Sequence, residues 1–188
     1  MKLNLGCGHE RLDGYLNVDR VGDPPFTWDL ESFPWPWPDS SAEEVRLHHV
    51  LEHLGATPAV YLRLIQELYR VCRDGAKVSI TVPHPRHDDF LVDPTHVRPI
   101  LPESFQLFSK KKCLEWVARG VSNSTLALWL DVDLEIDRVT HTLDPLWHAQ
   151  LQAGKLKAEE LSVMAQQIHN VIKETLIELR VVKPAERG

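Results

Sequence analysis

The stretch LNLGCGHERLDGYLNVD, residues 3–19, is the feature that most restricts how this chain can fold. A short apolar run ends at two closely spaced glycines, Gly6 and Gly8, and a second apolar run ends at Asp19. Glycine lets a ligand approach the backbone closely, and the carboxyl ends of neighbouring parallel strands open onto one crevice. An acid at the second strand end can accept hydrogen bonds from a ribose diol. The stretch therefore predicts a parallel sheet with a site for an adenosine-containing ligand.

The spacing within this stretch argues against a dinucleotide. The dinucleotide pattern G-x-G-x-x-G needs a third glycine, where this chain has Arg11, and a helix N-terminus that holds the pyrophosphate. Only residues 9–14 separate Gly8 from the next apolar run, which leaves too little room for a full crossover helix. S-adenosylmethionine carries no phosphate, so it is the favoured ligand. A nicotinamide-dependent reductase remains as a rival interpretation.

The pattern along the chain predicts an α/β fold, because strands come first and then alternate with helices. Short apolar or alternating runs predict strands over residues 2–6, 15–19, 26–30, 43–50, 77–83, 125–137 and 174–182. Apolar stripes at helical spacing predict helices over 57–75, 103–120 and 157–171, the first capped by Thr57 and ended by Gly75. We expect the two C-terminal strands to form a sheet edge, and the pattern leaves their direction of pairing open.

Length and composition restrict the class of protein further. The 188 residues fit a single domain, and 43% hydrophobic with 26% charged residues is the balance of a globular protein. The net charge of −6 argues against a nucleic-acid partner. No apolar run is long enough for a membrane span, and the N-terminus has no apolar signal-peptide core. Three widely spaced cysteines do not suggest a disulfide framework and favour the cytoplasm.

Five segments in order resemble the class I S-adenosylmethionine-dependent methyltransferases, in particular their small type 11-like branch. LNLGCG looks like the first motif of that family, and NVDR carries Asp19 where the family has its ribose-binding acid. WDLESF places Asp29 and Leu30 where the family contacts adenine. VRLHHVLEHL places His48 and His49 near the methionine end of the cofactor, and ELYRVCRDGAKVSITVP is similar to the next helix and strand.

This resemblance implies a doubly wound, mostly parallel, seven-stranded Rossmann-like sheet that binds S-adenosyl-L-methionine. Residues 1–84 would form the cofactor-binding half and residues 85–188 the acceptor site. The implied cofactor-binding residues are Gly6, Cys7, Gly8, Asp19, Arg20, Asp29, Leu30, His48 and His49. Three departures from the family are expected: Arg11 in place of the third glycine, a first helix shortened to a turn, and no N-terminal helices over the cofactor. A homodimer partner or the C-terminal helices would then have to cover it.

The polar segment 84–102 is the predicted acceptor side, because it follows the fifth strand. His84 and His96 are the candidate catalytic bases, since histidine titrates in the useful range. His87 and Arg98 are the candidate substrate-binding residues, the latter through its planar guanidinium. The same histidines and aspartates could chelate a metal, but their spacing matches no tight zinc pattern, so no metal is predicted. A polar loop held by its own hydrogen bonds is the remaining alternative.

Three further groups of residues are interpreted as structural. The tryptophans of PWPWP are expected to pack on the core or to cover adenine. Glu52 and His53 are expected to support the start of a helix or the cofactor residues. The last group is expected to form a solvated strand face and consists of Asp131, Asp133, Glu135 and Asp137.

The sequence thus predicts a methyltransferase that uses S-adenosylmethionine and acts by in-line displacement. Its acceptor would be a small molecule, a glycan or a lipid-linked intermediate. The alternative is a non-catalytic module that binds S-adenosylmethionine or adenosine and regulates or scaffolds a partner. Binding of the cofactor without turnover would distinguish this module from the enzyme.

Overall fold

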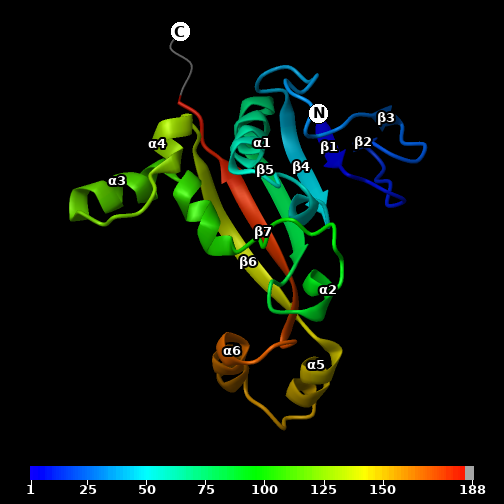
Figure 1. Cartoon of the computed structure of the whole chain (residues 1–188), viewed down its shortest axis with the longest axis vertical. Coiled ribbons are helices and arrows are strands. Elements are labelled where there is room, and N and C mark those ends of the chain that lie inside the picture. Colours follow the sequence, from blue (N-terminus) through cyan, green and yellow to red (C-terminus); the bar gives the residue numbers. More distant parts are fainter. Residues whose placement is uncertain (185–188) are drawn as a thin grey trace.

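A single seven-stranded sheet in the order β3-β2-β1-β4-β5-β7-β6 organises the chain (Figure 1). The structure is a computed structural model and describes residues 1–184. Five strands pair in parallel: β1 (Lys2–Leu5), β2 (Leu16–Asp19), β3 (Phe26–Thr27), β4 (Ala42–His48) and β5 (Cys72–Pro83). β7 (Ile172–Val181) lies antiparallel between β5 and β6 (Leu134–Leu143). The mostly parallel α/β sheet and the predicted C-terminal edge are confirmed, and that edge is antiparallel.

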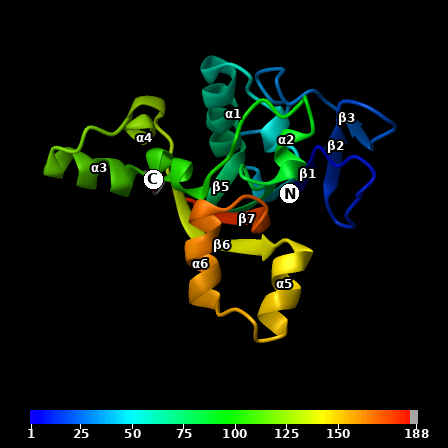
Figure 2. The same ribbon diagram turned by 60° about the horizontal axis from the view of Figure 1, so that its bottom comes forward.

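The helices lie around this sheet and beyond its ends. They are η1 (Leu51–His53), α1 (Pro58–Val71), α2 (Asp88–Leu91), η2 (Pro102–Phe108), α3 (Lys110–Arg119), α4 (Leu126–Leu130), α5 (Pro145–Gln152) and α6 (Ala158–Gln167). Figures 1 and 2 show α5 and α6 beside each other at the end of the sheet where β6 stops and β7 starts. α3 and α4 project from another side. Within residues 1–184, no helix has the length and apolarity needed to cross a membrane.

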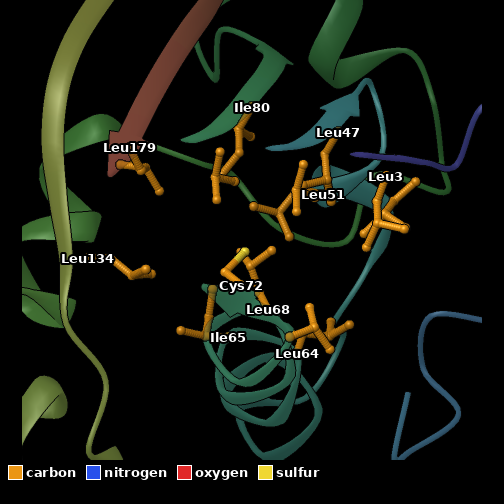
Figure 3. Packing of buried hydrophobic residues seen from close by; sticks show 14 of the residues in the cluster. Leu3, Leu47, Leu51, Leu64, Ile65, Leu68, Cys72, Ile80, Leu134 and Leu179 are labelled. Carbon is orange, nitrogen blue, oxygen red and sulfur yellow. The ribbon is translucent and has the colours of Figure 1, made fainter. Parts of the chain in front are cut away.

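The core lies between α1 and the central strands. Thr57 caps α1 by accepting a hydrogen bond from the Val60 amide, and Pro58 occupies its first turn. The buried face of the helix consists of Tyr61, Leu64, Ile65, Leu68 and Val71 together with Glu67. In Figure 3, Leu64, Ile65 and Leu68 lie opposite strand residues that include Leu3, Leu47 and Ile80. Burial of this stripe positions the sheet that carries the site.

A buried amide pair replaces the first crossover helix. Asn4 Nδ2 donates to Asn17 Oδ1 at 2.8 Å and to the Glu10 carbonyl at 2.8 Å. Asn17 also accepts from the Leu12 amide and donates to the Leu12 and Tyr15 carbonyls. These hydrogen bonds satisfy backbone groups of Glu10, Leu12 and Tyr15 within the segment 6–15, which forms turns instead of a helix. The predicted shortening of the first helix is therefore confirmed.

The PWPWP loop packs on the core through two residues of α1. Trp35 and Trp37 are only 4% and 5% exposed, which confirms that they pack inside. Glu67 accepts a hydrogen bond from the Trp35 amide at 2.7 Å, and Arg70 donates to the Trp35 and Trp37 carbonyls. Arg70 also donates to Glu67 at 2.7 Å, so the ion pair is hydrogen-bonded on both sides.

Two predicted boundaries are wrong. α1 ends at Val71 and not at Gly75, because Cys72 is already extended and pairs with Ala42 of β4. The helix predicted over residues 103–120 is divided at Ser109, which caps α3 through a hydrogen bond from the Lys112 amide.

The strand predicted over residues 125–137 is also wrong in its first half. Leu126–Leu130 form α4, since leucines four residues apart lie on one helical face as well as on one strand face. Asp131, in a left-handed conformation with φ of 54°, ends the helix, and β6 begins only at Leu134. The predicted acidic strand face is therefore reduced to residues within β6.

Candidate functional site

A cavity of about 300 Å³ lies at the carboxyl ends of β1, β2 and β4. The strand order reverses between β1 and β4, and ligands of open α/β sheets bind in the crevice at such a reversal. Its volume is at the lower end of the range of small-molecule sites. The lining residues are Gly6, Asp19, Arg20, Trp28, Asp29, Leu30, Glu31, His49, Val50, His53, Leu54 and Thr95.

Asp19 is held at the cavity by backbone amides. Its Oδ2 accepts from the Gly8 amide at 2.8 Å, and its Oδ1 accepts from the Arg20 and Val21 amides at 2.7 and 3.1 Å. These contacts fix the orientation of the carboxylate. A carboxylate has about four acceptor positions, so Asp19 keeps capacity for a ligand hydroxyl. The shortened loop and the acid therefore form one unit, because Gly8 donates to the residue that faces the cavity.

Positions 6 and 8 need glycine for different structural reasons. Gly6 has a φ of +66°, and a Cβ there would lie 2.4 Å from Val50 Cγ2 and 2.8 Å from Cγ1. Gly8 has a φ of +49°, and an added Cβ would meet nothing within 4 Å. Gly6 is thus required by packing against Val50 as well as by its backbone conformation, and it lines the cavity itself. Gly8 leaves open space beside the loop.

One end of the cavity combines an apolar surface with carboxylates. Trp28 and Leu30 flank Asp29 in sequence, and all three line the cavity. Asp29 Oδ1 accepts from the Glu31 amide at 2.9 Å, and Glu31 Oε1 accepts from the Gly55 amide at 2.7 Å. Leu30 is 5% exposed and forms part of the core. This end can hold a flat heterocycle and accept hydrogen bonds from it.

The two adjacent histidines after β4 differ in placement. His49 lines the cavity with a φ of 53°, an uncommon backbone conformation for a residue with a side chain. Its contact with the Glu52 carboxylate raises its pKa, and Glu174, at 3.2 Å from Nε2, adds to this effect. Burial, followed by the neighbouring His49, lowers the pKa of His48, whose ring lies outside the lining of this cavity.

The predicted cofactor residues are largely brought together. Those in the cavity lining are Gly6, Asp19, Arg20, Asp29, Leu30 and His49. Cys7 and Gly8 belong to the same turn, but Cys7 is buried and burial raises the pKa of its thiol. These positions fit the expectation from sequence, and their contact with a cofactor stays a prediction.

The predicted acceptor residues are not brought together. His84 lines a second cavity of about 810 Å³ beside α6, where burial, followed by His141, lowers its pKa. His87 is buried, accepts from the Asp89 amide and contacts Asp144 Oδ2 at 3.4 Å. Arg98 donates to the Gly55 carbonyl at 2.6 Å and stacks on the Tyr61 ring. His87 and Arg98 thus already have protein partners.

His96 lies beside the first cavity without lining it. Its ring stacks on Phe90 and faces the ring of His53, with centroids 4.6 Å apart. Thr95, the neighbouring residue, lines the cavity. The position of His96 therefore fits a candidate base, and its role as a base stays a prediction.

Sequence reasoning missed several lining residues. These are Trp28, Glu31, Val50, Leu54 and Thr95, with His53 assigned only to a supporting role. Trp28 and Glu31 flank the predicted Asp29–Leu30 pair, so their position next to the third strand was the available signal. Thr95 reaches the cavity from the irregular segment after β5, where no periodicity predicts which side chain faces inward.

Comparisons with known proteins identify the fold. Neither a scan against protein-family models nor a search of curated proteins finds a match. Among solved structures, the chain is similar to a SAM-dependent methyltransferase from Archaeoglobus fulgidus, with a TM-score of 0.58, 19% identity, and coverage of 95% of this chain and 85% of that one. It is also similar to the YcgJ protein from Bacillus subtilis, with a TM-score of 0.52, 14% identity and coverage of 97% and 92%.

A third similar structure has a different chemistry in its description. The 4+2 cyclase SpnF aligns with a TM-score of 0.53 and 15% identity, over 97% of this chain and 75% of that one. Further SAM-dependent methyltransferases, including one from Methanosarcina mazei, match as well. The chain therefore has the fold of the class I S-adenosylmethionine-dependent methyltransferases, as its sequence resemblance predicted.

Proposed function

We propose that the cavity at the ends of β1, β2 and β4 binds S-adenosylmethionine and that the protein transfers its methyl group to an acceptor. The observation that carries this proposal is the convergence of Asp19, Gly6 and the Asp29–Leu30 pair on one cavity. Asp19 would accept hydrogen bonds from the ribose hydroxyls. Asp29 and Leu30 would hold adenine, the first through its carboxylate and the second through its apolar side chain. The methionine end would then extend toward His49.

The geometry favours this ligand over a dinucleotide. Residues 6–15 form turns, so no helix N-terminus stands after β1 to hold a pyrophosphate. The carboxylates of Asp19, Asp29 and Glu31 would repel phosphates, whereas the sulfonium and the ammonium group of S-adenosylmethionine are cationic. A nicotinamide cofactor is therefore the weaker candidate.

Methyl transfer would depend on positioning more than on strong acid or base chemistry. The sulfonium is already an activated donor, so the protein must align the acceptor atom, the methyl carbon and the sulfur. Such alignment is worth roughly 7–11 kcal/mol of the barrier at best. An acceptor hydroxyl would also need a base, for which His96 is the candidate beside the cavity. A small molecule, a glycan or a lipid-linked intermediate remains the proposed acceptor class.

A non-catalytic binding module is the second candidate. SpnF shares this fold and is described as a cyclase, so the fold alone does not fix the reaction. Binding of S-adenosylmethionine without methyl release across a panel of acceptors would favour the module. Turnover of the cofactor with any acceptor of the panel would favour the methyltransferase.

The compartment and the partners belong to the same proposal. Cys7, Cys72 and Cys113 are all buried and unpaired, which suits a reducing cytoplasm. The lining of the cavity contains no residue of α5 or α6 within the described part of the chain. These helices therefore do not cover the bound cofactor in this arrangement, and we propose that a homodimer partner covers it instead.

The first test is calorimetric titration with S-adenosylhomocysteine and with NAD. We expect binding of S-adenosylhomocysteine only, and a loss of about 10- to 100-fold in affinity for Asp19→Asn, because hydrogen bonds to a charged group contribute about 1.5–3 kcal/mol. Asp13→Asn is the matched control, since Asp13 is exposed on the same loop. Equal affinity in both variants, or preferential binding of NAD, would contradict the proposal.

A further inference from the structure

Three side chains at the edge of the cavity converge on one point. Glu52 and His53 end the short helix η1 after β4, and His96 comes from the segment after α2. One ligand atom from each of the three lies within 4.8 Å of the others. The residues are 44 positions apart at their widest in sequence (52 to 96), so β4 and the segment after α2 must both be in place to form the cluster. His53 and Thr95 also line the candidate cofactor cavity.

The hydrogen bonds of both imidazoles are made by Nδ1, and Nε2 of each ring makes none within residues 1–184, although His96 Nε2 lies 3.9 Å from Asp93 Oδ2. His96 Nδ1 lies 2.8 Å from the Phe90 carbonyl, which only accepts, so this nitrogen carries the proton. His53 Nδ1 lies 2.9 Å from Thr95 Oγ1, and that hydroxyl donates to Asp93 Oδ1 at 2.6 Å. The Thr95 oxygen therefore accepts from His53. In each ring Nε2 is therefore the nitrogen that remains for a metal ion, since a ligating imidazole usually donates its other nitrogen to an outer partner.

Glu52 is a buried carboxylate without a hydrogen-bond donor. Its side chain is fully buried, and neither of its oxygens accepts a hydrogen bond within residues 1–184. His49 Nδ1 lies 3.4 Å from Oε1, which is an ion-pair distance without the alignment of a hydrogen bond. An ionised carboxylate in this position costs several kcal/mol unless a cation or donors compensate it. The half-exposed His49 imidazole supplies part of that compensation, and a metal ion would supply the rest.

We propose that Glu52, His53 and His96 form a site for a divalent transition-metal ion of the zinc class. Two imidazoles and one carboxylate are the ligands of catalytic zinc sites, whereas magnesium and calcium prefer oxygen ligands. Ligand atoms around tetrahedral zinc lie about 3.3 Å apart, so the side chains must close slightly on the ion. The hydrogen bonds to Phe90 and Thr95 hold the rings for this closure, as outer partners do in known sites.

Three protein ligands leave a coordination position for an exogenous group. Because His53 and Thr95 line the cavity, that position lies at its edge. This step rests on the proposed methyl transfer: the acceptor would bind the ion through an oxygen, as a hydroxyl or a carboxylate, and the ion would take the place of His96 as the group that activates a hydroxyl. The acceptor class is then narrowed to molecules that carry such an oxygen donor.

The test measures metal binding without any cofactor. Metal-free protein is titrated with Zn²⁺, and binding is measured by calorimetry. A second titration uses Co²⁺ and visible absorption, because Co²⁺ in a site of low symmetry shows d–d absorption bands. We expect one ion per chain, with affinity reduced at least 100-fold in His53→Ala and in His96→Ala. His148→Ala is the matched control, because His148 is exposed on α5 and outside the cluster. No saturable binding, or equal binding in all three variants, would overturn the site.

Glu52→Gln provides a second measurement that does not depend on the folding of the alanine variants. If Glu52 is a metal ligand, the Glu52→Gln variant should bind metal more weakly, and its metal-free form should have a higher thermal unfolding midpoint than the metal-free unmodified chain. If Glu52 serves only the ion pair with His49, the same change should lower that midpoint and leave metal binding unaltered, which would overturn the proposal. Since no cofactor is present, failure of S-adenosylhomocysteine binding would be a separate result.

Discussion

At the scale of single residues, Gly6 shows how the cavity depends on one missing side chain. Any other residue at this position would combine backbone strain, from the positive φ, with a steric clash, because its Cβ would lie 2.4 Å from Val50 Cγ2. Gly8, two positions later, shares the positive φ but faces open space. A comparison of these two glycines therefore separates the effect of backbone strain from the effect of the clash with Val50.

We expect Gly6→Ala to lower the free energy of unfolding more than Gly8→Ala. Gly8→Ala should cost about 1–2 kcal/mol for the left-handed conformation, and Gly6→Ala a further ~1–3 kcal/mol for overpacking. Urea unfolding of both variants measures the difference. The double variant Gly6→Ala with Val50→Ala should recover part of the extra stability lost in Gly6→Ala, because the clash with Val50 is removed. Equal losses in both single variants would show that Val50 does not restrict this turn.

Single-residue patterns predicted part of the site. Gly6 and Asp19 could be identified because they lie at the ends of neighbouring strands, which converge, and Asp29 was identified through the family resemblance. The burial of Glu52 and its approach to His96 could not, since they depend on how an irregular segment returns to β4. Periodicity gives no information about such a segment. The position of His84 at a separate cavity has the same cause.

At the scale of elements, the ion pair between Glu67 and Arg70 holds the tryptophan loop on α1. Burial by itself would raise the pKa of Glu67, but hydrogen bonds from Arg70 and the Trp35 amide lower it below its ordinary value of 4.5. A carboxylate with a lowered pKa stabilises the fold above its unfolded pKa. That contribution is lost as the pH falls through the folded pKa.

We therefore expect Glu67→Gln to be less stable than the unmodified chain at pH 7, by about 1.5–3 kcal/mol, because the charged hydrogen bonds of Glu67 are lost while Arg70 keeps its ion pair with Asp39. The difference should narrow as the pH falls below about 4.5, where the unmodified chain loses the same charge. Thermal unfolding between pH 3 and pH 7 measures it. Glu159→Gln, an exposed glutamate on α6, is the control and should show no such narrowing. A difference that is constant with pH would contradict this account.

The order of the elements could be predicted, but several boundaries could not. Strands before helices indicated the parallel sheet, and the short gap after Gly8 indicated the missing helix. Leu126, Leu128 and Leu130 have the alternation of a strand, while Leu126 and Leu130 also have the spacing of a helix. Over so short a run only tertiary packing decides that α4 is a helix. Cys72 begins β5 because Ala42 pairs with it, and such a long-range partner is absent from local patterns.

At the scale of the whole molecule, the strand order determines where a ligand can bind. β1 and β4 run side by side while their connections leave in opposite directions, so the sheet itself opens the crevice. The overall fold is what the chain shares with the Archaeoglobus fulgidus methyltransferase at 19% identity. The side chains that line the crevice are this chain's own, and they carry the proposed specificity.

The most direct measurement of the central claim is a crystal structure of the protein grown with S-adenosylhomocysteine. We expect the nucleoside in the cavity beside Gly6, with its ribose hydroxyls on the Asp19 carboxylate and its adenine against Leu30. Nucleoside density at the second cavity beside His84, or ribose hydroxyls directed away from Asp19, would contradict the account.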